Sequence, residues 1–355
     1  MARVAREGLV KAIVVREFGP PSVMRLEDVD DPRPGPGEVL VRVHAVSVNR
    51  TLDTVVRAGK FKRRVTLPLV LGIDPSGVIV EVGPGVTSRK VGDRVVTLTR
   101  VQSESAADGP QLLGVHAWGG YAEYFKARAD GTAIVPDGVD FPTAIVVARH
   151  APTAFHLLRD RAQVARGEWV LVMGAAGGLG SAGVQVAKCL GAKVIAAAGA
   201  DKRVEAALNL GADAGVNYRA QDLTAEAMRI TEGKGVNVVF ENIGDPELFP
   251  KAFAAIARNG RLVTAGGHGG GIVPLDVNRL YLKQITVIGA TGQTPADLVL
   301  SLQAAAQGRF KAIIACVLPL AQAPLAHELV ESRAVLGKVV LDPTQQTNGR
   351  QNVPG

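Results

Sequence analysis

Apolar and polar positions alternate with two different rhythms along this chain. Between Gly167 and Gln307, short apolar runs are separated by stretches of helical periodicity, a pattern that predicts a doubly wound α/β domain with a parallel sheet. The expected strands are EWVLVMG (168–174), AKVIAAA (192–198), GVNY (215–218), VNVVFENIG (236–244), RLVTAGG (261–267) and QITVIGAT (284–291). The expected helices are SAGVQVAKCLG (181–191), KRVEAALNLG (202–211), LTAEAMRITEG (223–233), ELFPKAFAAIARNG (247–260) and ADLVLSLQAAAQG (296–308).

Glycines follow four of these helical stretches. Gly191, Gly211, Gly233 and Gly308 stand where a helix end favours a left-handed residue, so each is expected to terminate its helix.

The rest of the chain is rich in strand patterns. Residues 1–142 contain alternating runs such as VLVRVHAVSV, broken by Pro-Gly turns, and they show little helical periodicity. After Phe310, two apolar runs and one helical stretch are expected to return to this part. We therefore expect a discontinuous β-rich domain (1–142 and 310–345), an inserted α/β domain (143–309) and a frayed tail (346–355).

Composition narrows the class of protein. The chain has 355 residues, 47% of them hydrophobic, which suffices for two cores. Its apolar runs are far shorter than the roughly 18 residues of a membrane span, and MARVAREGLV lacks the apolar stretch of a signal peptide. We expect a cytoplasmic protein without a membrane partner. Two cysteines, Cys189 and Cys316, are expected to lie in the cores.

The net charge of +7 does not predict nucleic-acid binding. Lysines and arginines are spread along the chain, and a nucleic-acid binder would gather them in a stripe. The densest run, KFKRR (60–64), is either a solvated loop or an anion site.

A glycine-rich turn follows the first expected strand of the α/β domain. The segment VLVMGAAGGLGSAGVQVAKCLGAKVIAAAG reads as strand, turn, helix and strand, the setting in which backbone N–H groups bind a pyrophosphate. Gly178, Gly180 and Gly183 fit GxGxxG literally. Ala175, Gly177 and Gly180 fit it with alanine first, and this register is preferred because it begins directly after the strand.

The end of the next strand favours NADPH over NADH. Gly199 stands nineteen residues after Gly180, where an acid would bind the ribose 2′-OH of NAD. Lys202 and Arg203 follow it and suit a 2′-phosphate. Asp201 is the opposing feature, since its carboxylate could accept from a 2′-OH.

Several segments together resemble the medium-chain dehydrogenase/reductase superfamily over nearly the whole chain. They are GPGEVLVRV, VNRTLD, VRAG, PLVLGIDPSGVIVEVGPGV, VGDRV, GGYAEY, GAAGGLG, AAAGADKR, VNYR and GKVVL, in the family's order. The resemblance implies a Rossmann domain and a β-rich GroES-like domain. The branch that it resembles is the zinc-independent NADPH:quinone oxidoreductases and related enone reductases.

The resemblance also locates the zinc-ligand positions of the alcohol dehydrogenases. Their first cysteine falls at Asn49, their GHE loop falls at Gly72-Ile73-Asp74, and their third ligand falls near Arg149. A catalytic zinc needs at least three side-chain ligands. Residues 101–118 lack the cysteines of a structural zinc lobe. We expect no metal, and we interpret the histidines at 44, 116, 150 and 156 as core or loop residues, His150 beside the expected cleft.

The resemblance further implies a set of cofactor-binding residues. The glycine turn would hold the pyrophosphate, and Lys202 with Tyr218 would meet the 2′-phosphate, with Arg203 nearby. The full set is Thr153, Gly177, Gly178, Leu179, Gly180, Gly199, Lys202, Arg203, Tyr218, Asn242, Gly266, Thr291, Arg333 and Lys338.

The expected reaction is hydride transfer from NADPH to a quinone or an α,β-unsaturated carbonyl. Asn49 is the candidate hydrogen-bond partner of substrate or nicotinamide, and Asp53 either holds this loop or caps the turn before VRAG. Many quinone reductases carry an aromatic residue two positions after this acid, whereas here Asp53 is followed by Thr54, Val55 and Val56. An acyl-CoA enoyl reductase using KFKRR, a ketone/alcohol oxidoreductase and a non-catalytic NADPH-binding protein remain alternatives. QITVIGAT resembles the edge strand of family homodimers, so a homodimer is expected.

Overall fold

The computed structural model of this chain describes residues 8–97, 100–101 and 111–345, so the expected tail, 346–355, lies outside the described residues. Contacts divide the chain into two compact units. Unit 1 is Met1–Arg149 with Ala312–Gly355, and unit 2 is His150–Lys311. No helix among the described residues is long and apolar enough to cross a membrane.

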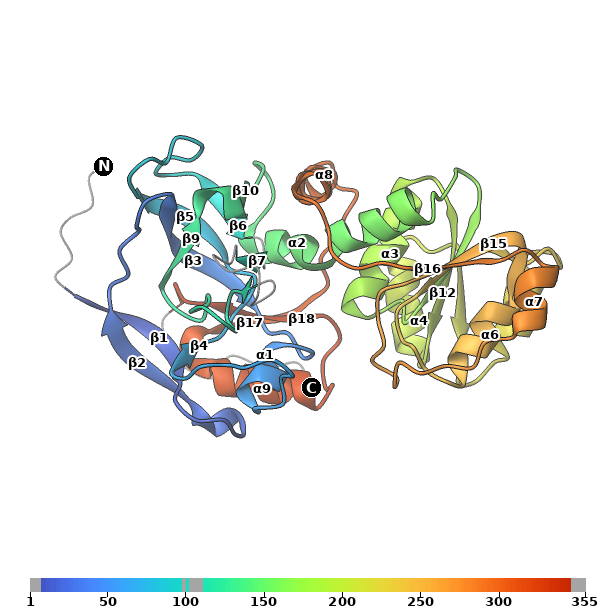
Figure 1. Ribbon diagram of the computed structural model, residues 1–355, viewed down its shortest axis with the longest axis horizontal. Helices are drawn as coiled ribbons and strands as arrows, with labels where there is room; N and C mark the ends of the chain where they lie inside the picture. Colours follow the sequence, from blue (N-terminus) through green and yellow to red (C-terminus); the bar gives the residue numbers. More distant parts are fainter. Residues whose placement is uncertain (1–7, 98–99, 102–110, 346–355) are drawn as a thin grey trace. The chain divides into compact units, whose positions relative to one another are not determined.

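Unit 2 is the expected doubly wound domain. Its six parallel strands run in the order β13-β12-β11-β14-β15-β16, with the first strand of the unit, β11, near the centre. The strands are β11 (Trp169–Met173), β12 (Lys193–Ala198), β13 (Ala214–Asn217), β14 (Val236–Glu241), β15 (Ile256–Thr264) and β16 (Thr286–Gly289). Figure 1 shows helices on both sides of this sheet, which confirms the predicted fold class.

The helices of unit 2 lie between these strands. They are α3 (Gly178–Cys189), α4 (Asp201–Asn209), α5 (Leu223–Ile230), α6 (Leu248–Ala254), α7 (Val277–Leu282) and α8 (Pro295–Ala306). The predicted helix 247–260 is too long, because Ile256 pairs with Val236 and already belongs to β15. α7 was not among the expected helices.

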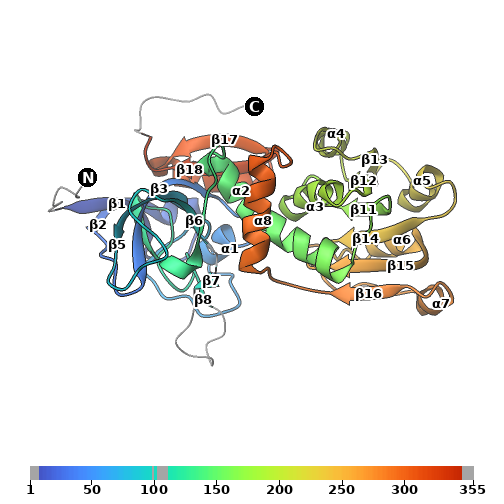
Figure 2. The same ribbon diagram turned by 90° about the horizontal axis from the view of Figure 1, so that it is seen from above.

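Parallel strands covered on both faces must be apolar on both, and the core of unit 2 follows this rule. Leu171, Ile195, Val239 and Leu262 come from the four central strands and are fully buried, and Phe253 of α6 packs on them. Figure 2 shows the same strands from above, with β16 at one edge of the sheet.

The expected glycine stops are confirmed by the backbone. Gly191, Gly211 and Gly308 each follow the last turn of a helix with φ of 80°, 101° and 71°. Gly233 also has a positive φ, but Glu232 before it already turns left-handed with φ of 54°.

Unit 1 is built mainly from antiparallel strands. Its main sheet runs β10-β6-β5-β3-β18-β17 with β9 also pairing β3, and a smaller sheet runs β2-β1-β4. The strands are β1 (Leu9–Val15), β2 (Met24–Asp30), β3 (Glu38–Ser47), β4 (Leu69–Val70), β5 (Ser76–Val82), β6 (Arg94–Thr97), β7 (Arg100–Val101), β8 (Gln111–Leu112), β9 (Tyr124–Arg128), β10 (Thr132–Ile134), β17 (Ile314–Pro319) and β18 (Lys338–Asp342). The strands after Phe310, β17 and β18, therefore belong to the same sheet as β3.

Helices of unit 1 are few. They are α1 (Asp53–Arg57), α9 (Ala323–Glu331) and α2 (Phe141–Phe155), which continues as a π-helix at His156–Arg161 and contains the boundary between the units. β18 pairs antiparallel with β3, so Lys338 at its start and Ser47 at the end of β3 come close together. This pairing positions the polar cluster described below.

Candidate functional site

The glycine turn of unit 2 leaves a helix N-terminus open. β11 ends at Met173, and α3 begins at Gly178 with Gly177 as an N-cap that makes no side-chain hydrogen bond. A Cβ on Gly180 would lie 2.1 Å from the carbonyl oxygen of Gly174. Backbone N–H groups that no side chain caps suit a pyrophosphate, so the turn fits a dinucleotide. The turn begins directly after the strand, as the register with Ala175 first requires.

His150 lies against this turn. A Cβ on Gly178 would be 2.4 Å from the Nε2 atom of His150, so only glycine fits under the imidazole. A Cβ on Gly183 would meet the ring of Phe240 at 2.8 Å. The first of these glycines serves the turn, and the second allows α3 to pack closely on the sheet.

Asn242 and Gly266 come together at the carboxyl ends of neighbouring strands. The Asn242 side chain donates to the carbonyl oxygen of Met173, and a Cβ on Gly266 would be 2.3 Å from the Asn242 carbonyl oxygen. Ligands of doubly wound sheets bind at this edge. Elsewhere in unit 2, Thr153 Oγ1 donates to Gln293 Oε1 at 3.1 Å, and Thr291 is exposed.

The residues expected at the adenosine end form a second group. A Cβ on Gly199 would lie 3.0 Å from the Tyr218 ring. Lys202 and Arg203 are exposed in the first turn of α4. Asp201 accepts a hydrogen bond from Asn217 Nδ2 at 2.7 Å.

Arg219 is a further cation in this group that sequence reasoning missed. Burial raises the pKa of Tyr218, and the charges of Arg219 and Arg203 oppose that rise. Both guanidinium groups therefore act on the Tyr218 hydroxyl. The VNYR segment contained the only signal, an arginine directly after the tyrosine.

In unit 1, a buried polar network surrounds Asp74. Its Oδ1 accepts from the Ser47 backbone N–H at 2.9 Å, and its Oδ2 accepts from Ser47 Oγ at 2.6 Å and from Asn49 Nδ2 at 3.2 Å. Asp74 and Ser47 are fully buried, and Asn49 is 4% exposed. Three donors satisfy this carboxylate, so it stays in place without a metal.

Lys338 joins the network from β18. Its Nζ donates to Asn49 Oδ1 at 2.5 Å and lies 3.4 Å from Ser47 Oγ. Burial lowers the pKa of Lys338 to about 8, the positive charge of Arg149 acts in the same direction, and Asp74 and Asp53 oppose it. The ammonium group can therefore release a proton near neutral pH.

Asp53 is a second unusual acid. Its Oδ2 accepts from the Asn49 backbone N–H at 2.7 Å, and its Oδ1 has no hydrogen-bond partner among the described residues. Burial raises the pKa of Asp53 to about 7, and the charge of Asp74 adds to the effect. The carboxyl group therefore holds the loop through the backbone N–H of Asn49. With this pKa, its protonated and ionised forms are both populated near neutral pH.

Behind this loop, a buried chain of side chains leads from Tyr121 to Glu331. The Tyr121 hydroxyl lies 3.2 Å from His327 Nε2, Arg57 Nη1 lies 3.5 Å from His327 Nδ1, and Arg57 Nη2 forms an ion pair with Glu331 at 2.6 Å. Burial lowers the pKa of His327 to about 3, with Arg57 adding to the effect, so this histidine is neutral. Arg57 is the last residue of α1, so these side-chain contacts fix the helix that begins at Asp53.

The resemblance places the zinc ligands of the alcohol dehydrogenases at or near Asn49, Ile73 and Arg149. Asn49 is engaged by Lys338 and Asp74, Ile73 is an apolar side chain that is 1% exposed, and Arg149 carries a positive charge. None of these side chains is a ligand that zinc prefers.

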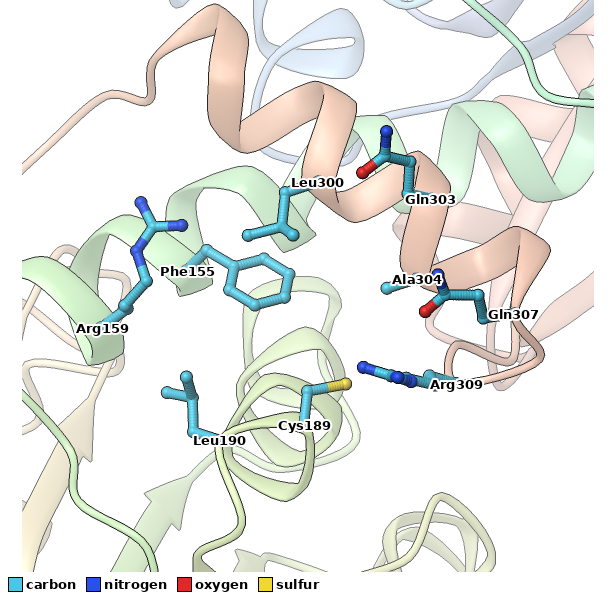
Figure 3. A pocket seen from close by; sticks show the side chains of 9 residues that line it. All are labelled: Phe155, Arg159, Cys189, Leu190, Leu300, Gln303, Ala304, Gln307 and Arg309. Carbon is cyan, nitrogen blue, oxygen red and sulfur yellow. The ribbon is translucent and has the colours of Figure 1, made fainter.

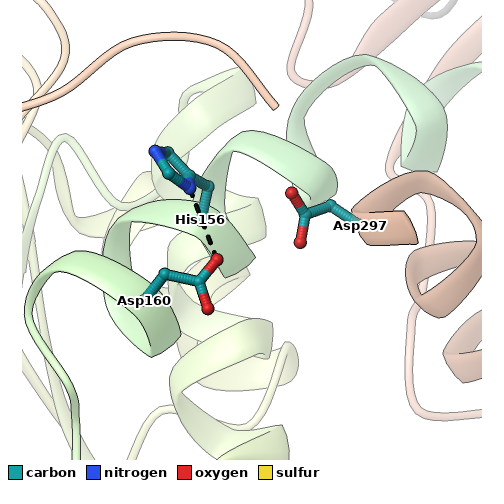
Figure 4. Close-up of side chains that lie close together, drawn as sticks. All are labelled: His156, Asp160 and Asp297. Atoms are coloured by element: carbon teal, nitrogen blue, oxygen red, sulfur yellow. Dashed lines mark hydrogen bonds and ion pairs between the residues drawn. The ribbon is translucent and has the colours of Figure 1, made fainter. Parts of the chain in front are cut away.

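Within the described ranges, one group of three possible metal ligands comes together elsewhere, at His156, Asp160 and Asp297 of unit 2 (Figure 4). His156 Nδ1 lies 3.3 Å from Asp160 Oδ2. Arg159 forms ion pairs with both carboxylates, at 2.7 Å each. A guanidinium ion thus already neutralises the two acids.

A small pocket lies beside that group in unit 2. It has a volume of about 210 Å³ between the ends of α3 and α8, and Figure 3 shows Cys189 and Arg309 pointing towards each other across it. Burial raises the pKa of the Cys189 thiol, and Arg309 opposes this. The lining contains none of the residues expected to bind cofactor or substrate.

The structure thus gathers the predicted residues into separate groups. Asn49, Asp53 and Lys338 share one network in unit 1. Arg333, also in unit 1, is exposed with φ of 56° after α9 and shares no hydrogen bond with them. Ser47 was missed in the sequence, where a serine at the end of an apolar strand gives no signal of its own.

Comparisons with known proteins agree with this geometry. The zinc-binding dehydrogenase family matches residues 178–307, and the alcohol dehydrogenase GroES-like domain matches residues 35–137. A quinone oxidoreductase of Sus scrofa is 32% identical over 343 residues, which cover 94% of this chain and 98% of that protein. An NAD-dependent alcohol dehydrogenase of Sulfolobus acidocaldarius is 33% identical, with 94% and 100% covered.

A solved structure shows the same fold throughout. The crystal structure of AibC superposes with a TM-score of 0.89 at 33% sequence identity, and the match covers 97% of this chain and 100% of that one. These matches cover 94% to 97% of this chain and therefore include residues of both units. The chain therefore belongs to the medium-chain dehydrogenase/reductase superfamily, is similar to its quinone oxidoreductases, and is an oxidoreductase of a family that binds a nicotinamide cofactor.

Proposed function

We propose that this protein transfers hydride from NADPH to a quinone or an α,β-unsaturated carbonyl without zinc. The observation that carries the proposal is the hydrogen bonding of Asn49, which stands where the resemblance places the first zinc ligand, with Asp74 and Lys338. A zinc ion stabilises the alkoxide in alcohol oxidation, and this network has no equivalent Lewis acid. It offers hydrogen-bond donors, which suit the oxygen of an enolate or a reduced quinone.

The cofactor supplies the hydride when it is bound, and the chain orients it. In our proposal the N-terminus of α3 and Gly177–Gly180 hold the pyrophosphate, and Asn242, Gly266, Thr153 and Thr291 line the ribose and nicotinamide. Arg333 contributes a further phosphate contact. Asn49 hydrogen-bonds the substrate or the nicotinamide, and Asp53 keeps its loop in place through the Asn49 N–H.

The preference for NADPH is supported by three features of the adenosine end. Gly199 leaves room beside Tyr218, and Lys202 and Arg203 are exposed where a 2′-phosphate would need cations. Asp201, which could select NADH, is held by Asn217.

We further propose that the protein is a homodimer that pairs through β16. This strand is one of the two edge strands of the sheet in unit 2, the other being β13. The segment 272–287 exposes apolar side chains, which we name the edge patch: Ile272, Leu275, Val277, Tyr281, Leu282 and Val287. An exposed edge strand beside such a patch favours pairing with a second copy.

A second candidate, reduction of an acyl-CoA thioester, is favoured by one observation in unit 1. Lys60, Lys62 and Arg64 are exposed, and no hydrogen bond or ion pair joins their side chains to another described residue. Free cations of this kind suit the phosphates of CoA. A triple alanine variant would then raise KM for an enoyl-CoA and leave KM for a free enone unchanged, with Lys251→Ala as the control for loss of an exposed cation.

The proposed function is tested by NADPH consumption across quinones, enones, enoyl-CoA esters, ketones and secondary alcohols. Turnover of quinones or enones, unaffected by a chelator, is the expected result. Asn49→Ala should lower kcat with little change in Kd for NADPH, while Asn209→Ala, at an exposed amide of α4, should change neither. Alcohol oxidation that depends on one tightly held zinc ion per chain would refute the proposal.

A further inference from the structure

Lys338 is the titratable member of the polar network of Asn49, Asp53, Asp74 and Lys338 whose side chain is partly exposed to solvent. Asp53 and Asp74 are fully buried and Asn49 is 4% exposed, whereas Lys338 is only partly buried. A substrate oxygen that approaches Asn49 therefore meets the ammonium group of Lys338, which donates to the same amide at 2.5 Å. The Nδ2 group of Asn49 already donates to Ser47 and Asp74, so within this pair the donor that faces such an oxygen is Lys338.

We propose that Lys338 is the proton donor of the reduction and delivers its proton to the carbonyl oxygen of the substrate. This inference rests on the proposed function. It gives Lys338 a role in the chemistry in place of the cofactor contact that its GKVVL motif implies.

The proposed step balances in charge and in bonds. As the β-carbon of an enone accepts the hydride supplied by the cofactor, the C=C electrons move to form a new C=C bond to the carbonyl carbon, and the C=O π electrons move to oxygen. An N–H bond of Lys338 breaks and an O–H bond forms, which gives an enol and a neutral amine. The enol becomes the ketone in water, and the amine takes a proton from solvent. With a quinone, the ring carbon accepts the hydride and Lys338 protonates the conjugated carbonyl oxygen in the same way. The ring carbon then loses a C–H proton to water while the second carbonyl oxygen gains a proton from water, which gives the hydroquinone.

The surroundings of Lys338 suit an amine that is protonated and neutralised in turn. Asp74 faces it from the loop before β5, Asp53 from α1, and Arg149 from α2. The two carboxyl groups favour the ammonium form, and burial with Arg149 favours the amine. A general acid works best when its pKa lies near the working pH, and this balance brings Lys338 there.

Asn49 keeps the amine in position through both states. Its Oδ1 accepts from Lys338, and its Nδ2 donates to Asp74 Oδ2 at 3.2 Å. The amide is thereby fixed in one orientation, because a flipped amide would bring its NH₂ group against the ammonium ion. A neutral amine still donates to the same oxygen.

Steady-state kinetics of Lys338→Met and Lys338→Arg test the proposal. The native enzyme should lose kcat as the pH rises through about 8, because the amine form has no proton to give. Lys338→Met should lose about 10²-fold in kcat at neutral pH and lack this basic limb. Lys338→Arg, whose guanidinium stays protonated, should also be slow but independent of pH in this range.

Two readouts separate proton donation from a structural role. Kd for NADPH, measured by fluorescence titration, should stay within a few-fold of native in Lys338→Met, and a small primary amine in the buffer should restore part of its kcat. Lys283→Met is the matched control, because burial also lowers the pKa of Lys283 but no carboxyl group is among the causes of that shift. It should leave the pH profile unchanged.

A measurement on the protein without cofactor completes the test. After reductive methylation with ¹³C formaldehyde, the signal that is absent from Lys338→Met should titrate near pH 8, well below the exposed lysines. Titration with the exposed lysines, or native kcat with an intact basic limb in Lys338→Met, would overturn the proposal. If the native protein reduces no compound of the panel, the proposed function fails first and the role of Lys338 falls with it.

Discussion

Among single residues, Asp53 should make the stability of the protein depend on pH. Its pKa rises from an ordinary 3.8 to about 7 on folding, so the folded state binds more protons than the unfolded chain between these values. Stability therefore falls as the pH rises from about 4 to about 7, by about 4 kcal/mol at most. Asp53→Asn keeps an oxygen for the Asn49 N–H but cannot ionise.

Urea unfolding of Asp53→Asn at several pH values checks this prediction. The variant should gain stability relative to the native protein as the pH rises from 4 to 7, with its own curve flatter in this window. Asp137→Asn, at an exposed carboxylate, should run parallel to the native curve. A difference between Asp53→Asn and native that stays constant with pH would show that Asp53 is ionised throughout.

Single residues also show how much of the candidate site could be predicted from the sequence. Asn49 and Asp53 could be found because both stand in one family motif, four residues apart. Lys338 was expected from its GKVVL motif, but as a cofactor contact. Ser47, Tyr121 and His327 were not expected, since Ser47 is 291 positions from Lys338 and Tyr121 is 206 positions from His327. The pairing of β18 with β3 brings Lys338 to Ser47, and His327 of α9 lies against Tyr121. No local pattern encodes either contact.

At the scale of elements, the glycine turn yields a matched pair of variants. A Cβ on Gly180 would be 2.1 Å from the Gly174 carbonyl oxygen, whereas a Cβ on Gly177 would approach that oxygen only to 3.2 Å at φ of −76°. Gly180→Ala must move α3 away from β11 and should cost about 1–3 kcal/mol of stability. Gly177→Ala should cost far less.

Thermal unfolding and NADPH titration of both variants test the turn. Gly180→Ala should lower Tm and weaken NADPH binding at least tenfold, because the N-terminus of α3 shifts. Gly177→Ala reports on contact with the cofactor alone. Equal Tm values for the two variants would mean that the turn relaxes without moving the helix.

The first turn of α4 should set the choice of dinucleotide. The double variant Lys202→Ala/Arg203→Ala removes two exposed cations of this turn, of which Arg203 acts on Tyr218. Loss of charge-assisted hydrogen bonds should raise Kd for NADPH about tenfold or more. Kd for NADH should not change. Lys251→Ala, at an exposed lysine of α6, is the control, and tighter NADH than NADPH binding in the native protein would contradict the assignment.

The elements themselves were largely predictable, for a physical reason. Buried parallel strands are continuous apolar runs, so all six strands of unit 2 stood out, and glycines punctuated the helix ends. The error at Ile256 arose because AAIARNG has helical spacing, whereas pairing with Val236 places Ile256 in β15. Tertiary pairing here overrides the local pattern.

At the scale of the whole molecule, the edge patch predicts that two copies associate. Val287 of the edge strand β16 is 42% exposed, and Tyr281 and Leu282 in α7 are each 61% exposed. Val287→Lys places a charge on this edge, where a second strand would have to desolvate it, so it should shift the protein towards monomer. Light scattering coupled to size exclusion measures the change. Leu208→Lys, at an exposed leucine of α4, should keep the native mass, and a native protein that is monomeric at micromolar concentration would disprove the pairing.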